Sequence, residues 1–390
     1  MAEAGRSGPG GSGFPVVGVV GGGQLARMMA GPAIELGVTL RVLARDPADS
    51  AAQVVPLDPS TDIGDEDDLE ALRRFAKGCD VLTFDHEHVP TGHLRALAAD
   101  GVLVRPGPDA LEHAQDKLHM RRRLSALGVP CPRWAEVSTL DELAAFGDEV
   151  GWPVVLKTPR GGYDGKGVRL VDSADEAQDW LARGGSLLAE ERVRFTRELA
   201  ALVARSPHGQ AAAWPVVETV QVDGVCREVY APAPVAEDHA TSAQQVALRI
   251  AAGLGVTGVL AVEMFDTPSG VLVNELAMRP HNSGHWTIEG SRTSQFEQHL
   301  RAVLDLPLGD TSMTAPYVAM SNVLGGDLAE MYSGYLHCFA HDPGVRIHMY
   351  GKDVRPGRKV GHTTALGDDA EDVRARAQHA AAFLRGDIDG

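Results

Sequence analysis

The hydrophobic pattern of the N-terminal part alternates between apolar runs and helical periods. Val16–Val20 is unbroken apolar, three glycines follow, and apolar residues then recur at helical spacing over 25–36. Further apolar runs at 38–43 and 81–84 flank an acidic helical stretch at 65–75. Strands that alternate with helices predict an α/β fold with a parallel, doubly wound sheet covered on both faces.

The pattern changes after residue 112, where we place a domain boundary. Strands there are joined by short glycine turns instead of helices, and the longest helical stretch is rich in alanine. The expected elements are helices at 117–127 and 241–254, and strands at 154–157, 168–171, 258–266 and 271–276.

Pro307 and Gly309 mark a second boundary near residue 306. A smaller β-rich domain is expected beyond it, with strands at 317–322, 335–339 and 345–350 and a closing helix at 370–384. The expected domains are therefore 14–112, 113–306 and 307–390, after a Gly- and Ser-rich tail at 1–13 that we expect to be disordered.

Composition narrows the classes of function. The chain has 390 residues, 44% of them hydrophobic, which is enough to bury more than one core. Its 36 Lys and Arg against 53 Asp and Glu give a formal charge of −17, which disfavours nucleic acid and anionic membranes as partners. The four cysteines are widely spaced, and the chain has neither an apolar signal segment nor the roughly 18 consecutive apolar residues of a spanning helix. We therefore expect a cytoplasmic protein.

Two acidic residues on the long strands carry the first candidate chemistry. If a three-residue loop joins the strands, Glu263 pairs with Glu275. The residues then expected on their face are apolar: Ala261, Phe265, Val271 and Val273. Paired carboxylates in apolar surroundings are costly without a cation, so we expect a Mg²⁺ site that bridges phosphates. A four-residue loop would place Asn274, another oxygen ligand, opposite Glu263, and a solvated acidic edge is the plain alternative.

A glycine-rich segment at 161–167 lies between two expected strands. Its backbone N–H groups could lie over phosphates, and Lys157 and Lys166 add positive charge. The segment lacks the ending of a P-loop, and an ordinary surface hairpin is the alternative.

The first glycine turn raises a rival hypothesis. Gly21-x-Gly23-x-x-Ala26, with Asp46 beyond the next strand, is a degenerate dinucleotide fingerprint and would suit an NAD-dependent dehydrogenase. No hydride-transfer constellation follows downstream, whereas the lysines, the glycine hairpin and the paired carboxylates favour a nucleoside triphosphate.

Two further runs are dense in functional side chains. RPHNSGH at 279–285 follows the second acidic strand directly, which brings a guanidinium and an imidazole beside the expected metal. Four cations at 352–359 stand out in an acidic chain and fit a phosphate or carboxylate receptor. Asp85 and Glu87 end an expected parallel strand, which is where open α/β sheets bind ligands.

Together, these segments resemble one family. The matching motifs are GGGQLARMM at 21–29, LKTPRGGYDGKG at 156–167, VEMF at 262–265, VNELAMRPHNSGHWT at 273–287, SQFEQHLRA at 294–302 and YGKDVRPGRKVGH at 350–362. They closely resemble the 5-(carboxyamino)imidazole ribonucleotide synthases of the ATP-grasp superfamily, over nearly the whole chain after residue 14.

The resemblance implies a fold and a reaction. The fold would comprise a Rossmann-like N-terminal domain, an ATP-grasp domain with a lid at about 130–190, and a β-rich C-terminal domain, assembled as a homodimer. In the reaction, ATP would phosphorylate bicarbonate to carboxyphosphate. The amine of 5-aminoimidazole ribonucleotide would then take up the carboxyl group or the released CO₂, in purine biosynthesis.

The resemblance also implies site residues. Those for ATP would be Lys117, Lys157, Gly162, Tyr163, Asp164, Gly165, Lys166, Gly167, Glu190, Glu191, Val193, Glu198, Asn274 and Glu275. Glu263 and Glu275 would bind Mg²⁺, and Arg279, His281 and Asn282 would orient bicarbonate and stabilise developing negative charge. Those for the ribonucleotide would be Gln24, Leu25, Glu87, Tyr163, Asp164, Lys352, Arg358 and Lys359.

One departure and two rivals accompany the resemblance. Thr219 and Gln221 stand where many relatives carry an Asn-x-His pattern, so no role of that histidine is implied. The nearest rival is a formate-dependent glycinamide ribonucleotide transformylase, which shares the phosphorylate-then-acylate logic. A catalytically silent ATP-binding protein would be expected to lack a metal ligand or a phosphate lysine, and neither is lost here.

Overall fold

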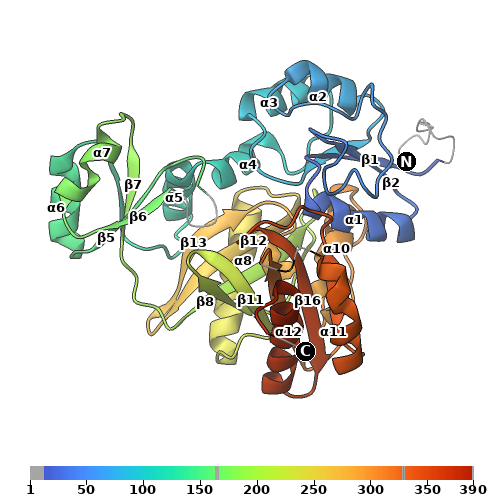
Figure 1. Cartoon of the computed structure of the whole chain (residues 1–390). Helices are drawn as coiled ribbons and strands as arrows, with labels where there is room; N and C mark the ends of the chain where they lie inside the picture. The colour runs from blue at the N-terminus through green and yellow to red at the C-terminus, as the bar shows by residue number, and fades with distance from the viewer. Residues whose placement is uncertain (1–12, 163–166, 327, 329, 389–390) are drawn as a thin grey trace.

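A small parallel sheet forms the N-terminal region. The computed structural model describes residues 13–162, 167–326, 328 and 330–388, and this region lies at the upper right of Figure 1. Its strands pair in the order β2-β1-β3, as the predicted α/β pattern requires. The elements are β1 (Val16–Val20), α1 (Gln24–Glu35), β2 (Thr39–Leu43), α2 (Leu69–Ala76), β3 (Val81–Phe84) and α3 (Thr91–Ala99).

A second sheet, here called the lid sheet, projects to the left in Figure 1. Its four strands pair antiparallel in the order β4-β7-β5-β6 around a small core that includes Leu143 and Leu156. The elements are β4 (Trp134–Val137), α6 (Leu140–Val150), β5 (Val154–Lys157), β6 (Val168–Val171), η1 (Ala174–Ala177), α7 (Gln178–Leu181) and β7 (Leu187–Glu191). α4 (Pro108–Gln115) and α5 (Lys117–Ala126) connect it to the N-terminal region.

A large antiparallel sheet occupies the centre of the molecule. Within the described residues it has nine strands, ordered β13-β12-β8-β10-β11-β14-β16-β15, with β9 on β8. Its strands are β8 (Arg197–Arg205), β9 (Ala211–Ala213), β10 (Val217–Val222), β11 (Val225–Ala231), β12 (Gly258–Thr267), β13 (Gly270–Ala277), β14 (Tyr317–Leu324), β15 (Arg346–Met349) and β16 (Lys359–Gly367). Its helices are α8 (Glu237–Gly253), η2 (Asn282–Gly284), α9 (Thr287–Gly290) and α10 (Gln295–Val303).

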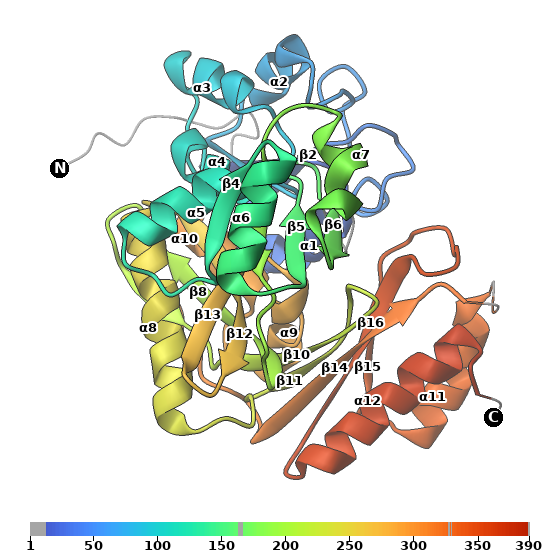
Figure 2. The same ribbon diagram turned by 90° about the vertical axis from the view of Figure 1, so that its left-hand side faces the viewer.

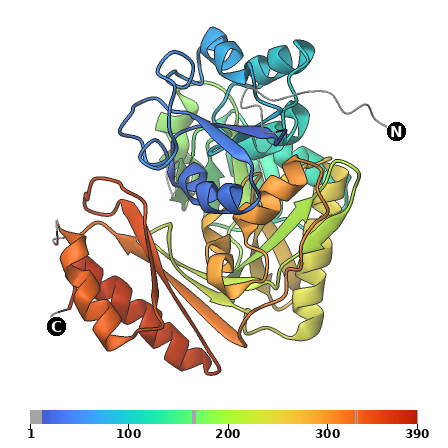
Figure 3. The same ribbon diagram turned by 90° about the vertical axis from the view of Figure 1, so that its right-hand side faces the viewer.

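The C-terminal strands continue this central sheet. β14 pairs antiparallel with β11, so backbone hydrogen bonding runs across the predicted boundary near residue 306. η3 (Met331–Gly334), α11 (Tyr335–His341) and α12 (Ala370–Arg385) accompany these strands, and α12 packs on β14 and β16 (Figure 2). Figure 3 shows this region at the lower left, with the N-terminal region above the other end of the sheet.

The strand predicted at 335–339 is wrong, because this segment begins α11. Met331, Gly334 and Cys338 are buried, which is helical spacing. The aromatic residues Tyr335 and Phe339 gave the segment a high strand propensity, but tertiary packing overrides that propensity here.

The hairpin of β12 and β13 corrects a second expectation. Thr267 pairs with Gly270, so the predicted three-residue loop is wrong, but a bulge between Glu263 and Met264 restores the predicted pairing of Glu263 with Glu275. The same bulge turns Val271 and Val273 into the main core, where they pack with Met264, instead of onto the face of Glu263.

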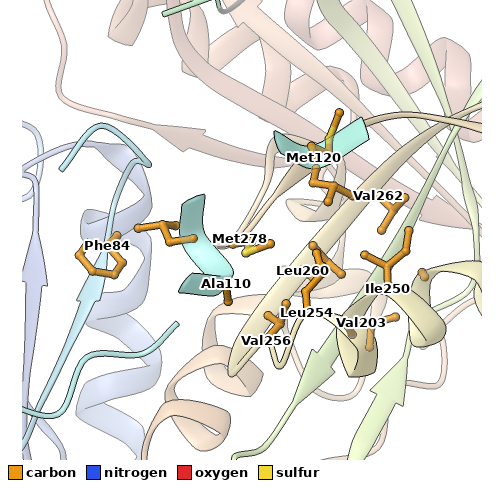
Figure 4. Packing of buried hydrophobic residues seen from close by; sticks show 14 of the residues in the cluster. Phe84, Ala110, Met120, Val203, Ile250, Leu254, Val256, Leu260, Val262 and Met278 are labelled. Carbon is orange, nitrogen blue, oxygen red and sulfur yellow. The ribbon is translucent and has the colours of Figure 1, made fainter. Parts of the chain in front are cut away.

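One continuous core joins the N-terminal region to the central sheet. Phe84 of β3, Ala110 of α4 and Met120 of α5 belong to the same buried cluster as Ile250 of α8 and Val262 of β12 (Figure 4). The large side chains among them, such as Phe84 and Ile250, each contribute roughly 1.5–3 kcal/mol on burial, which stabilises the strands that carry the candidate site. In the described part of the chain, no helix combines the length and apolar character needed to cross a membrane.

Candidate functional site

A cavity of about 890 Å³ opens between the lid sheet, the central sheet and the N-terminal region. The ATP, metal and bicarbonate candidates that line it are Lys117, Lys157, Gly162, Glu190, Glu191, Val193, Glu198, Glu263, Asn274, Glu275, Arg279, His281 and Asn282. Glu87 and Lys359, expected for the ribonucleotide, line it as well. Residues far apart in the sequence thus share one volume.

Some expected residues lie elsewhere. Tyr163, Asp164, Gly165 and Lys166 are outside the described residues. Those described that are not among the lining residues of this cavity are Gly167, Gln24, Leu25, Lys352 and Arg358.

Glu263 and Glu275 lie directly opposite each other on the central hairpin. Burial and the negative charges of Glu275 and Glu198 together raise the pKa of Glu263 to about 7. The ammonium of Lys117 contacts Glu275, with Nζ 2.8 Å from Oε1. Excess negative charge on oxygen donors suits a hard cation such as Mg²⁺. Within the described residues, no three acidic, His or Cys side chains form a complete metal site, so phosphates and water would supply the other ligands.

A buried ion-pair network links the lid sheet to this hairpin. Lys157 Nζ lies 2.7 Å from Glu190 Oε2 and 2.9 Å from Asn274 Oδ1. Arg121 of α5, which is fully buried, donates to Glu190 Oε1 at 2.5 Å and to the Asn274 carbonyl at 2.8 Å. Although burial alone would raise the pKa of Glu190, Lys157 and Arg121 lower it to about 2. Glu190 is therefore ionised and fixes Lys157 beside the hairpin.

Sequence reasoning missed Arg121. It lies in the basic run at 121–123 of the helix expected at 117–127, and no motif distinguished it from the two arginines that follow. Leu118 and Leu124, three residues away on either side, are buried, and their spacing would have placed Arg121 on the buried face.

The wall next to the lid sheet is apolar. Phe195 stacks on Phe265 with ring centroids 4.9 Å apart, and both line the cavity beside Val193. Phe195 was another residue that the sequence did not single out. Burial raises the pKa of the nearby Glu198 to about 7. Glu191 has its carboxylate on Arg133, with Oε2 2.8 Å from Nε.

Arg279 is held by a carboxylate from the N-terminal region. Its Nε donates to Glu87 Oε2 at 2.7 Å, while Glu87 Oε1 accepts from the Met278 backbone at 3.2 Å. Gln115 of α4 in turn donates to the Glu87 carbonyl at 2.8 Å. Glu87 therefore fixes the direction of the Arg279 guanidinium.

His281 presents its Nε2 edge to the paired carboxylates. Its Nδ1 accepts from the Ser283 backbone at 3.4 Å and lies 2.8 Å from Ser283 Oγ, and its Nε2 lies 3.5 Å from Glu263 Oε1. Burial and the positive charges of Arg279 and Lys359 together lower the pKa of His281 to about 3. The imidazole is therefore neutral at pH 7, with its proton on Nε2.

Asn282 is fixed by a second amide. Its Nδ2 donates to Asn322 Oδ1 at 2.9 Å and its Oδ1 accepts from Asn322 Nδ2 at 2.8 Å. Asn322 also donates to the Cys226 carbonyl at 2.9 Å. Because the two amides pair reciprocally, the orientation of Asn282 is set by β14.

The remaining residues expected to bind the ribonucleotide lie in the N-terminal and C-terminal regions, and two of them contact each other. Lys352 Nζ lies 2.5 Å from Oε1 of Gln24, the first residue of α1. Arg358 donates to the Asp353 carbonyl at 3.3 Å. The side chain of Leu25 is buried in the core of the N-terminal region, so only its backbone is left for a ligand.

Asp85 explains the first glycine turn without a dinucleotide. Its Oδ1 accepts from the Ala26 backbone at 2.7 Å, and a Cβ on Gly23 would lie 1.9 Å from its Oδ2. A carboxylate therefore fills the N-terminus of α1, where the pyrophosphate of a dinucleotide would bind. This arrangement argues against the dehydrogenase hypothesis.

Family models match the chain in three consecutive parts. Residues 15–115 match the ribonucleotide synthetase preATP-grasp domain and residues 122–296 match the ATP-grasp domain. Residues 318–376 match the phosphoribosylaminoimidazole carboxylase C-terminal domain. The expected three-part ATP-grasp architecture is confirmed.

Whole-length relatives agree. The N5-carboxyaminoimidazole ribonucleotide synthase of Mycobacterium tuberculosis is 57% identical over 95% of this chain and 88% of its own length. That of Corynebacterium ammoniagenes is 48% identical, over 95% and 92%.

Solved structures of the same kind superpose closely. The N5-carboxyaminoimidazole ribonucleotide synthetase of Thermus thermophilus gives a TM-score of 0.84 at 39% identity, over 96% of this chain and 99% of that one. The Aspergillus clavatus enzyme in complex with ADP and 5-aminoimidazole ribonucleotide gives 0.87 at 34% identity, over 96% and 99%.

Proposed function

The chain belongs to the N5-carboxyaminoimidazole ribonucleotide synthase family of ATP-grasp ligases, and from that premise we propose that its cavity couples ATP cleavage to the carboxylation of 5-aminoimidazole ribonucleotide by bicarbonate. One observation carries the assignment to this cavity. His281 Nε2 lies 3.5 Å from Glu263, so the candidate bicarbonate residues adjoin the paired carboxylates and the two lysines of the phosphate site. The Aspergillus relative bound to ADP and 5-aminoimidazole ribonucleotide supports both ligands.

We propose that ATP lies between the lid sheet and the hairpin. Lys117 and Lys157 would bind its phosphates, and the wall of Phe195 and Phe265 would pack against the adenine. Glu263 and Glu275 would hold Mg²⁺, which supplies charge neutralisation to the phosphates when bound. Lys157 is pre-placed for this role because Glu190 and Asn274 fix its ammonium.

Bicarbonate would bind at Arg279, His281 and Asn282. One of its oxygens attacks the γ-phosphorus of ATP, a P–O bond forms, and the bond to ADP breaks. The guanidinium of Arg279 and the Nε2–H of His281 stabilise the negative charge on the carboxyphosphate oxygens. His281 donates a hydrogen bond and does not take up a proton at neutral pH, since its pKa is about 3.

The second half-reaction needs the ribonucleotide amine beside that intermediate. The amine nitrogen bonds to the carboxyl carbon, the bond from that carbon to the phosphate oxygen breaks, and the departing phosphate takes up the proton that the nitrogen loses. Gln24, Lys352, Arg358 and Lys359 would bind the ribonucleotide where the two ends of the chain meet. Enclosure of the cavity would keep water from the intermediate. The resemblance further supports a homodimer.

ADP release in the presence of 5-aminoimidazole ribonucleotide, with and without bicarbonate, tests the proposal. We expect release to depend on bicarbonate and to stop when the ribonucleotide is replaced by glycinamide ribonucleotide and formate. ADP release that is the same in bicarbonate-free buffer would contradict it.

A further inference from the structure

The helix α10 carries three fully buried polar side chains that the proposed chemistry does not use. Gln295, Gln298 and His299 lie in the motif at 294–302, and all three are 0% exposed. The apolar residues of α10, such as Phe296 and Leu300, pack into the core of the N-terminal region. Buried polar groups of this kind are costly unless each finds its partners.

Gln295 uses every hydrogen of its amide on the loop at 279–285, here called the site loop. Its Oε1 accepts from the His281 backbone N–H at 2.8 Å, and its Nε2 donates to the His281 carbonyl at 2.8 Å. Nε2 also lies 3.0 Å from His285 Nδ1. A backbone N–H can only donate and a carbonyl can only accept, so the amide has one possible orientation.

The close approach of this amide depends on a glycine. A Cβ on Gly284 would lie 2.3 Å from Gln295 Oε1, too close for any other residue at that position without rearrangement. Gln295 therefore holds the backbone of the site loop at His281, the residue whose imidazole lies beside Glu263.

We propose that Gln295 is a positioning residue for carboxylation, which holds the His281 backbone so that Nε2–H of His281 meets the reacting bicarbonate. The inference rests on the proposed roles of the site loop. Without these hydrogen bonds the loop shifts. Bicarbonate then binds more weakly, and ATP is cleaved without carboxyl transfer.

Gln298 supplies a matched control. One turn away on α10, its amide makes the same two-point contact with a different segment: Nε2 donates to the Gly309 carbonyl at 2.9 Å and Oε1 accepts from the Gly309 N–H at 2.7 Å. Neither of these two hydrogen bonds goes to the site loop. Gln295→Met and Gln298→Met thus each remove a buried amide that pairs with the N–H and the carbonyl of one backbone residue.

The experiment measures both variants beside the wild type for melting temperature, the KM values of bicarbonate and ATP, and carboxylated product formed per ADP released. We expect Gln295→Met to raise the bicarbonate KM at least tenfold and to lower product per ADP at least threefold, with the ATP KM within twofold. Gln298→Met should keep wild-type KM values and coupling at a similar melting temperature.

A purely structural Gln295 would reduce the active fraction alone. The bicarbonate KM and the product per ADP of Gln295→Met would then equal those of Gln298→Met, and that result would overturn the inference. If Gln295→Met does not fold, Gln295→Asn and Gln298→Asn, which keep a neutral amide but shorten its reach, are compared by the same readouts. Wild-type enzyme that makes no carboxylated product would refute the proposed function instead, independently of Gln295.

Discussion

Single residues in the cavity carry charge that destabilises the fold when no ligand is bound. Glu263 is buried opposite Glu275, and its raised pKa records the cost of ionising it there. Its neighbour His281 is buried and neutral. The carboxylate pair therefore makes sense as a binding site for positive charge and not as a stabilising feature.

Glu263→Gln separates these two roles. The amide removes the repulsion with Glu275, so the melting temperature without metal and nucleotide should stay equal or rise. Turnover at fixed Mg²⁺ should fall by more than the roughly 10–100-fold that losing an outer partner of a metal ligand costs. Calorimetry and ADP release check both, with the exposed Glu136→Gln as control. Normal turnover in Glu263→Gln at ordinary Mg²⁺ would refute the metal assignment.

Residues of the site differ in how readily the sequence reveals them. The lysines, the acidic pair and the site loop are predictable because their chemistry is visible in local motifs. Arg121 and Gln295 were not recognised, and Asp85 was expected at a ligand-binding edge and not at the N-terminus of α1, because each acts on a partner that only the tertiary structure brings near.

Among the elements, α5 connects the lid sheet to the central hairpin through the buried guanidinium of Arg121. Arg121 touches Glu190 on β7 and the Asn274 carbonyl on β13. The neighbouring Arg122 also makes an ion pair, with Glu136 on β4, but at the surface. The two arginines on one helix thus differ mainly in burial.

Arg121→Met should cost far more than Arg122→Met. Removing one partner of a buried pair costs about 3–5 kcal/mol, whereas an exposed pair contributes about 0–1 kcal/mol. Without Arg121, Glu190 holds Lys157 more tightly, so the KM for ATP should also rise. Urea unfolding and ATP kinetics provide the measurements. Equal effects of the two substitutions on both readouts would contradict the account of this network.

Prediction of an element was wrong where residue propensity and the spacing of buried residues disagree. The residues at 335–339 favour a strand, but the buried residues are spaced as in a helix, and this packing decides the structure. In the β12–β13 hairpin, the turn and the bulge each shift the pairing by one residue, and no local pattern in the sequence announces the bulge.

At the scale of the whole molecule, the site is assembled from both ends of the chain. Gln24 at the start of α1 meets Lys352 beyond β15, and Glu87 of the N-terminal region holds Arg279 of the centre. The N-terminal and central regions share one core, which keeps these contacts in place.

Lys352→Ala should affect one substrate only. Loss of a charge-assisted contact costs about 1.5–3 kcal/mol, which is roughly tenfold or more in the KM for 5-aminoimidazole ribonucleotide. The KM for ATP should not move, because Lys352 is not among the residues that line the cavity. Steady-state kinetics with each substrate varied in turn decide the point. A rise in the ATP KM instead would place this cluster in the nucleotide site.

His299 makes folding stability depend on pH. It accepts from the Val259 backbone at Nδ1, lies 2.7 Å from Thr83 Oγ1 at Nε2, and has its pKa lowered to about 3 by burial. The unfolded chain, with a pKa near 6.5, binds a proton that the folded protein does not, so this residue destabilises the fold as pH falls from about 6.5 towards 3. By pH 5 the loss is on the order of 2 kcal/mol.

His299→Gln should therefore flatten the decline of unfolding free energy between pH 7 and pH 5. The measured quantity is the change in unfolding free energy between the two pH values and not its absolute value. A hydrogen bond that the substitution removes is missing at both pH values and therefore cancels. If the unfolding free energies of variant and wild type, measured by urea titration, change equally with pH, then His299 is not kept neutral by the fold.

In the proposed reaction, this cavity transfers a carboxyl group from bicarbonate to the ribonucleotide amine, driven by the cleavage of ATP. Isotopically labelled bicarbonate, supplied with Mg²⁺, ATP and 5-aminoimidazole ribonucleotide, tests it most directly. We expect one labelled carboxyl on the ribonucleotide for each ADP released, and neither product with Glu263→Gln. ADP release with no label on the ribonucleotide would contradict it.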